Sequence, residues 1–137
     1  MHSVTETGMV EAINALCSEI HSWAIGKGFW PWEYNWNFAE KIALIHSELS
    51  EALEIHRNPG PFGQEAMMWW TDKIGNRVSA TRTQGACEKP EGIAIELADA
   101  VIRIMDLCGK MEIDLGRAIL DKMEYNRTRP HKHGKAY

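Results

Sequence analysis

The 137-residue chain has few cysteines, no long apolar run and no excess of basic residues. Its three cysteines are an odd number without a CxxC motif, which argues against a disulfide framework and favours a reducing compartment. Because no stretch reaches about 18 consecutive apolar residues, we expect no membrane span and no membrane partner. The first residues lack a basic segment ahead of an apolar core, so no signal peptide is expected. These absences together predict a cytoplasmic protein.

A basic charge balance is also missing, since the formal net charge is −4. Proteins that bind nucleic acid in general are usually basic, so we expect no nucleic-acid partner. A small phosphorylated ligand is compatible with this charge, because a local basic cluster can bind it. The length predicts one domain, residues 1–137, and the 45% share of hydrophobic residues is enough for a compact core.

What the sequence does contain is helical periodicity. Apolar residues recur at helical spacing over residues 7–25, 37–56 and 92–109 and again from 115 onward, with Asn37 and Asp114 as expected caps. A short helix over 64–74 is the one further element expected, and the part that follows it has no clear period and is interpreted as a loop. No segment predicts a strand convincingly. The expected fold class is therefore all-α, a bundle of four to five helices with an insertion at about 59–89.

The segment from Gly92 to Lys110 is apolar on nearly every side except one stripe. At about 100° per residue, this stripe collects Glu96, Asp99, Arg103 and Asp106. We expect the helix to be buried almost all round, with its carboxylates facing the interior. Buried carboxylates are costly unless they are paired or bound to a cation. The alternative to a site is a solvated helix face with salt bridges, in which Arg103 pairs with Asp99. Asp106 is interpreted as a partner of Arg103 or as a group behind the metal ligands, and not as a ligand itself.

A second acidic pair, Glu48-x-x-Glu51, lies in the preceding helix. Residues three apart are neighbours on a helix surface, and Glu48 falls between Ile45 and Ala52 inside the apolar arc. Two helices thus each present an acid pair toward the interior, and together the pairs form a cage of four carboxylates. Such a cage predicts a hard divalent cation, Mg²⁺ or, in its place, Mn²⁺.

These motifs are similar to those of a known family. Glu48-x-x-Glu51 followed by Glu96-x-x-Asp99, with the flanking strings KIALIHSELSEALE and KPEGIAIELADAVIRI, resembles the signature of MazG-like nucleotide pyrophosphohydrolases. The closing pattern Lys122-x-x-x-Asn126-x-x-Arg129 with a following His-Gly-Lys also resembles that family. The separation between the two acid pairs is longer than in compact members, so the insertion is interpreted as a lid, an arm that grips another subunit, or decoration.

The resemblance implies an all-α NTP pyrophosphatase fold, completed by assembly into a homo-oligomer, a dimer or a tetramer. It also implies Mg²⁺-dependent hydrolysis of nucleoside triphosphates, in particular deoxynucleotides, to the monophosphate and pyrophosphate. The expected metal ligands are Glu48, Glu51, Glu96 and Asp99. Either Glu48 or Glu51 is the expected acceptor of the proton of the attacking water.

The residues expected to hold the phosphates are basic or amide side chains: Lys122, Asn126, Arg129, Lys135 and Lys41. Lys41 precedes Glu48 by two helical turns, so it either contacts phosphate or neutralises the cage. The tryptophans between 23 and 36 can stack on a base or pack internally, and packing is the simpler interpretation for each. Met67 to Trp70 are likewise expected to be buried, or, if exposed, to mark a subunit contact.

Two alternatives to this function stay open. One is a helical interaction module that has kept the bundle without turnover. The other is an enzyme of the same kind that acts on a nucleoside diphosphate or on a modified nucleotide. A panel of nucleotides tested with and without Mg²⁺ separates all three.

Overall fold

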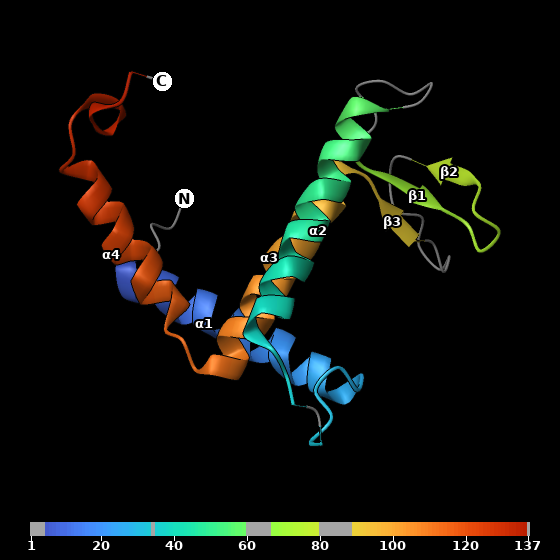
Figure 1. Cartoon of the computed structure of the whole chain (residues 1–137), viewed down its shortest axis with the longest axis horizontal. Coiled ribbons are helices and arrows are strands. Elements are labelled where there is room, and N and C mark those ends of the chain that lie inside the picture. The colour runs from blue at the N-terminus through green and yellow to red at the C-terminus, as the bar shows by residue number, and fades with distance from the viewer. Residues whose placement is uncertain (1–4, 34, 60–66, 80–88, 137) are drawn as a thin grey trace. The chain divides into compact units, whose positions relative to one another are not determined.

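The structure is a computed structural model, and it describes residues 5–33, 35–59, 67–79 and 89–136 (Figure 1). This part of the chain is mostly helical, with α-helices α1 to α4 and three short strands, so the predicted all-α class is confirmed. The chain divides into two compact units. The first comprises Met1–Tyr34 and Met105–Tyr137, and the second comprises Asn35–Ile104. Each unit is described by itself below.

The first unit is built on the pair of helices α1 (Glu6–Gly26) and α4 (Leu115–Arg127), which pack against each other. Asn14 of α1 connects them, because its Oδ1 accepts a hydrogen bond from the Gly116 amide at 2.9 Å and its Nδ2 donates to Asp114 Oδ1 at 2.7 Å. Asp114 is the N-cap of α4, as predicted, and also accepts from the Arg117 amide. A short 3₁₀ helix, η2 (His131–Gly134), follows α4.

The end of α3 (Ile93–Met111) belongs to this first unit and supplies part of its core. Cys17, Leu107 and Cys108 are buried there, so both cysteines pack in the core of this unit. Burial raises the pKa of both thiols. Gly109 is in close contact with α1, since a Cβ at this position would lie 2.5 Å from the Cβ of His21.

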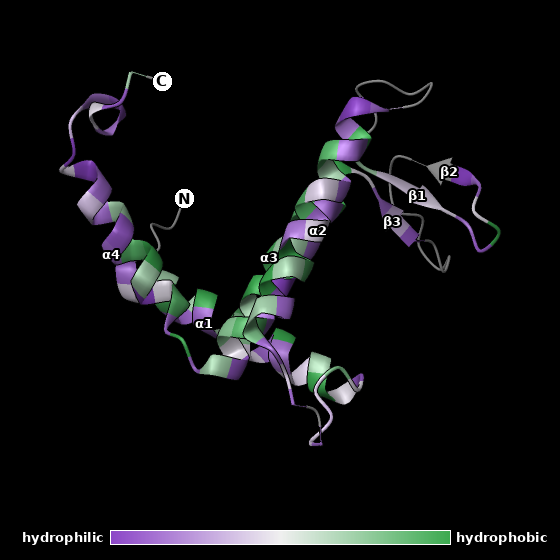
Figure 2. Cartoon of the chain, viewed as in Figure 1, coloured by the Kyte–Doolittle hydropathy of each residue, from purple (hydrophilic) through white to green (hydrophobic). Residues whose placement is uncertain are grey.

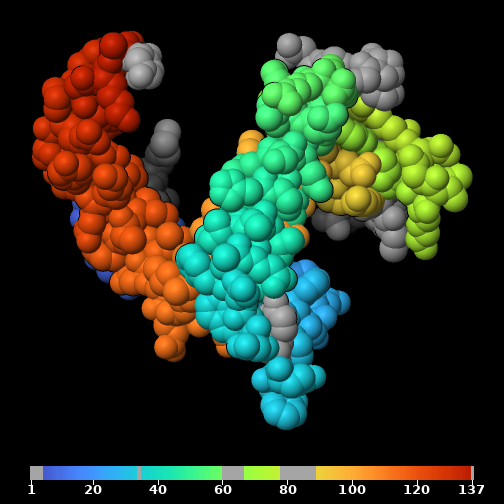
Figure 3. Space-filling model, viewed as in Figure 1, coloured from blue at the N-terminus to red at the C-terminus, as the bar shows by residue number. Residues whose placement is uncertain are grey.

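The second unit contains α2 (Phe38–Arg57) and the beginning of α3. The side chain of Asn37 accepts a hydrogen bond from the Glu40 amide, so the predicted cap is confirmed. Ile45 and Ala52 of α2 and Ala100 of α3 are buried. In Figure 3, α2 (teal to green) forms the face of this unit that is turned toward the viewer.

The second unit also contains a small antiparallel sheet, which the sequence did not predict. Its strands are β1 (Trp69–Thr71), β2 (Arg77–Ser79) and β3 (Lys89–Glu91), in the order β2-β1-β3. The helix expected over 64–74 is therefore wrong for the described residues from 67 onward, and so is the loop expected across β2 and β3. Strands of three residues are too short to show the alternation by which a strand is detected. Residues 60–66 and 80–88 of the insertion lie outside the described part.

The junction between β3 and α3 depends on Gly92. This residue has φ +119°, which L side chains rarely adopt, and a Cβ there would lie 2.6 Å from the backbone oxygen of Met67. Its carbonyl oxygen accepts hydrogen bonds from the Ile95 and Glu96 amides. The backbone of Gly92 thus sets where α3 begins, and with it the position of Glu96 in the first turn of the helix.

The expectation that α3 is buried almost all round is wrong within a single chain. Leu97 and Val101 are each 47% exposed, and Ile104 is exposed as well. Leu49 and Leu53 of α2 are also exposed, and hydrophobic positions (green) recur along the ribbons of both helices in Figure 2. Met67 and Met68, expected to be buried, are exposed too. The sequence pattern indicates how apolar a helix is. It does not indicate whether other residues of the same chain bury that apolar surface.

Candidate metal centre

Glu48 is placed inside the second unit by the helical spacing of α2. It follows the buried Ile45 by one turn and precedes the buried Ala52 by another, so it shares their face. Only 8% of the residue is exposed. The prediction that this glutamate interrupts an apolar arc and faces inward is therefore confirmed.

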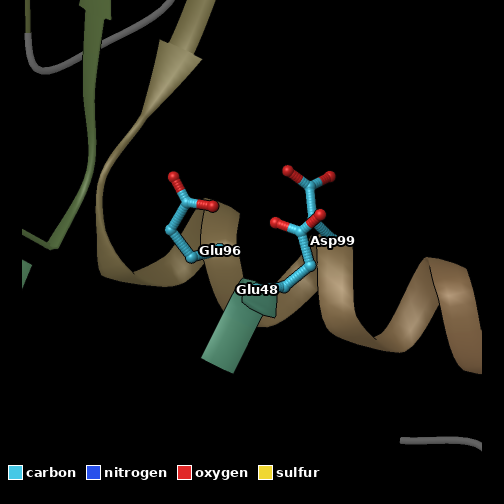
Figure 4. A group of neighbouring side chains, drawn as sticks. All are labelled: Glu48, Glu96 and Asp99. Atoms are coloured by element: carbon cyan, nitrogen blue, oxygen red, sulfur yellow. The ribbon is translucent and has the colours of Figure 1, made fainter. Parts of the chain in front are cut away.

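Three carboxylates meet at this face of α2. Glu96 and Asp99, three residues apart on α3, lie beside Glu48, and each of the three offers an oxygen within 4.8 Å of the other two. Figure 4 shows the three carboxyl groups close together, next to the turn where β3 leads into α3. Two of the three are half-buried and the third is buried. The sequence prediction that acids from two helices converge is confirmed for these residues.

Glu51, the fourth predicted ligand, is not one of these three. It is exposed, but it forms a side-chain hydrogen bond with Glu96. It therefore lies at the edge of the group formed by Glu48, Glu96 and Asp99, which we call the acidic cluster. Its assignment as a metal ligand stays a prediction.

The electrostatics of the acidic cluster favour proton or cation binding. Burial, the hydrogen bond with Glu51 and the negative charges of its neighbours raise the pKa of Glu96 from 4.5 to about 7. Burial and the charge of Glu48 raise the pKa of Asp99 as well, while Arg103 and Lys89 act in the opposite direction. The raised pKa values mean that the ionised carboxylates repel one another and lack enough nearby positive charge to balance them. A divalent cation would supply that charge.

The donor set fits a hard cation. Carboxylate oxygens are the ligands that Mg²⁺ and Ca²⁺ prefer, and two oxygens bound to the same Mg²⁺ lie roughly 3–4 Å apart. The spacing within the acidic cluster is close to this range. No histidine or cysteine belongs to the cluster among the described residues, so the donors favour Mg²⁺ or Mn²⁺ over zinc.

Arg103 contacts the acidic cluster in a way that the sequence did not predict. Its Nε donates to Glu48 Oε1 at 2.6 Å, across from α3 to α2. The ion pair of Arg103 is thus with Glu48, and not with Asp99 or Asp106 as in the alternative interpretation of the sequence, although the charge of Arg103 still lowers the pKa of Asp99. Spacing along one helix favours partners four residues away, and it gives no information on a partner in another helix.

Lys89 is a second cation near the acidic cluster that sequence reasoning missed. It lies in β3, where its Nζ is 3.2 Å from Glu91 Oε1, and its charge lowers the pKa of Asp99. The insertion thus contributes a positive charge beside the acids. A signal was present in the sequence, since Lys89 closely precedes the second acid pair.

Most of the predicted phosphate-binding residues belong to the other unit. Lys122 and Arg129 both lie over the ring of Tyr125, at 4.7 Å and 5.7 Å from its centre, so these two cations are brought together. Asn126 is half-buried and Lys135 is exposed. Lys41 is half-buried on α2, in the same unit as the acidic cluster. The role of all five in substrate binding stays a prediction.

Asp106 has a different role from that of the acidic cluster. It accepts hydrogen bonds from Trp30 Nε1 at 3.0 Å, and His21 Nδ1 lies 2.8 Å from its Oδ1. The side chains of His21 and Asp106 are mostly buried in the first unit. This group fixes the segment after α1 onto the end of α3. Trp23 and Trp32, in contrast, are exposed and are not core residues.

Comparisons with known proteins add no family assignment. No protein-family model, curated protein or solved structure matches the chain. Within the described residues, no helix combines the length and the apolar character that crossing a membrane requires. The resemblance to MazG-like enzymes therefore stays a prediction from the motifs.

Proposed function

We propose that the chain is a Mg²⁺-dependent nucleotide pyrophosphohydrolase of MazG-like type. Its substrates are nucleoside triphosphates, in particular deoxynucleotides of the cytoplasm, and its products are the monophosphate and pyrophosphate. The observation that carries the proposal is the meeting of Glu48, Glu96 and Asp99 from two helices, with oxygens within 4.8 Å of one another. Acids held this close together are costly without a cation, which favours the enzyme over a helical interaction module.

The residues of the acidic cluster would hold the cation through their carboxylate oxygens. Bound there, Mg²⁺ would neutralise phosphate charge and activate a water molecule. Glu51 is exposed and lies outside the three-residue group, so it is our candidate to accept the proton of the attacking water. Its charge raises the pKa of Glu96, so Glu51 lies close enough to the acidic cluster for this role.

Lys122 and Arg129 are proposed to bind the triphosphate oxygens. Both lie near the Tyr125 ring, which concentrates positive charge at the end of α4, and Arg129 offers a planar group that suits phosphate. Asn126 lies between them in the sequence, while Lys135 and Lys41 are proposed as further contacts. These residues position the substrate, which is the main requirement of phosphoryl-type substitution.

We further propose that the protein is a homo-oligomer, a dimer or a tetramer. Leu97, Val101 and Ile104 recur at helical spacing on α3 and are all exposed. A second copy of the chain would cover them, because contiguous exposed apolar surface is typical of subunit contacts.

The test is release of pyrophosphate from each ribo- and deoxynucleoside triphosphate, with and without Mg²⁺. We expect Mg²⁺-dependent turnover, and a fall of about 100-fold or more in Glu48→Gln and in Glu51→Gln. Glu54→Gln is the matched control, because Glu54 lies on the same helix, is exposed and bonds only Asn58 in the described contacts. We expect the control to retain full activity.

Other outcomes decide between the alternatives. If only nucleoside diphosphates or modified nucleotides are hydrolysed, the proposed substrate class is wrong, while the proposed Mg²⁺-dependent hydrolysis stands. If no nucleotide is hydrolysed and Mg²⁺ does not bind, the interaction module is the correct interpretation.

A further inference from the structure

The contact between Arg103 and Glu48 is short and joins two helices. Its Nε to Oε1 distance of 2.6 Å is that of a strong charge-assisted hydrogen bond. The two side chains differ in exposure, at 10% for Glu48 and 42% for Arg103. Arg103 thus reaches from the surface to a carboxylate that is almost fully covered.

This bond restricts an otherwise flexible side chain. Glutamate has several rotatable bonds, so burial alone does not fix where its carboxylate points. Arg103 donates to Oε1, and a carboxylate has a second oxygen with its own lone pairs, so this bond does not use up the carboxylate. An oxygen of Glu48 lies within 4.8 Å of oxygens of Glu96 and Asp99, so the orientation of the Glu48 carboxylate affects how the three groups can share a cation.

We propose that Arg103 is a positioning residue for Glu48, holding its carboxylate in the orientation in which the acidic cluster binds a divalent cation. This inference rests on the cation site of the proposed function. It assigns to Arg103 a role that acts through another side chain, and it does not require contact between Arg103 and substrate.

A competing interpretation makes the opposite prediction. If Arg103 served only as a counter-charge, its removal would leave the acidic cluster more negative and would strengthen cation binding. If it positions Glu48, its removal weakens binding, since loss of a partner that orients a metal ligand typically costs 10–100-fold in metal affinity. We favour positioning because the bond is short and is made to a buried carboxylate.

The experiment is a Mn²⁺ titration of the full chain, followed by the electron paramagnetic resonance signal of free Mn²⁺. We expect Arg103→Gln to raise the Kd by about 10–100-fold and Arg103→Lys to raise it less, because lysine keeps the charge without the planar group. Arg117→Gln is the matched control, since Arg117 forms an exposed ion pair with Asp121 on α4. The control should bind Mn²⁺ like the wild type.

A double variant shows whether Arg103 acts through Glu48. In the Glu48→Gln background, Arg103→Gln should cause no further change in Kd, because the bond that it removes is already lost. A further rise or fall in this background would overturn the inference. So would an Arg103→Gln variant that binds Mn²⁺ as tightly as the wild type or more tightly.

Circular dichroism accompanies each titration. If Arg103→Gln does not fold, Arg103→Lys decides, with weaker binding than wild type in support and equal or tighter binding against. A wild type that binds no Mn²⁺ overturns the inference together with the cation site of the proposed function. If the wild type binds Mn²⁺ and Arg103→Gln binds it with the same Kd, the cation site stands and only the positioning role of Arg103 is overturned.

Discussion

At the scale of single residues, Glu96 carries the clearest consequence of the acidic cluster. Its pKa of about 7 in the folded state exceeds the ordinary value of 4.5, so the folded state binds this proton more tightly than the unfolded state does. The free energy of unfolding therefore falls as the pH rises from 4.5 to about 7, because the folded state loses this tightly bound proton. Asp99 acts in the same direction, because its pKa is raised as well.

We therefore expect the free energy of unfolding, measured by urea denaturation in EDTA, to fall between about pH 5 and about pH 8. Glu96→Gln removes one titrating group and should flatten this dependence, leaving the part due to Asp99. Glu54→Gln should keep the wild-type slope. Equal slopes in the wild type and in Glu96→Gln would contradict the raised pKa.

The acids of the site could be predicted from the sequence, while their partners could not. Glu48, Glu96 and Asp99 are each recognisable from spacing, because the period of one helix decides which side chains share a face. The bond from Arg103 to Glu48 depends on how two helices pack. No spacing within α3 contains that information.

At the scale of elements, the helices were predictable and the strands were not. Caps such as Asn37 and Asp114 mark helix starts in the sequence itself. The sheet consists of three-residue strands, and its central strand β1 pairs with the nearby β2 and also with β3, which lies on the far side of the insertion. In the turn between β1 and β2, Asp72 Oδ1 accepts hydrogen bonds from the Ile74 and Asn76 amides.

Two glycines allow the packing of the first unit to be tested. A Cβ at Gly109 would lie 2.5 Å from the Cβ of His21 and 3.0 Å from the Cys17 carbonyl oxygen, whereas one at Gly26 would meet nothing within 4 Å. We expect Gly109→Ala to lower the free energy of unfolding by about 1–3 kcal/mol through overpacking. Gly26→Ala should leave it unchanged or raise it by up to about 1 kcal/mol.

Thermal and urea denaturation of both variants, measured side by side, check this prediction. Two variants of equal stability would mean that α1 and the end of α3 do not approach each other as closely as described.

At the scale of the whole molecule, the main feature is apolar surface that the chain does not cover. Leu97, Val101 and Ile104 on α3 are exposed, as are Leu49 and Leu53 on α2. The sequence pattern predicted that α3 is buried almost all round, and within one chain this prediction is wrong. Assembly would restore the burial that the sequence pattern indicates.

We expect light scattering coupled to size-exclusion chromatography to give a molar mass that is a multiple of the 15.6 kDa of one chain. Val101→Glu places a charge on the exposed face of α3 and should shift the protein toward the monomer, because burying an unpaired charge is costly. Ser18→Glu, at an exposed polar position of α1, should not change the mass. A wild type that is monomeric at tens of micromolar would refute the assembly.

The backbone of Gly92 limits how this protein can be redesigned. Any side chain at that position would meet the Met67 carbonyl, so the start of α3 is determined by the absence of a side chain. In a library that randomised residues 89–99 and was selected for a new ion preference, positions 96 and 99 would vary with the ion. Position 92 would return glycine in nearly every folded member.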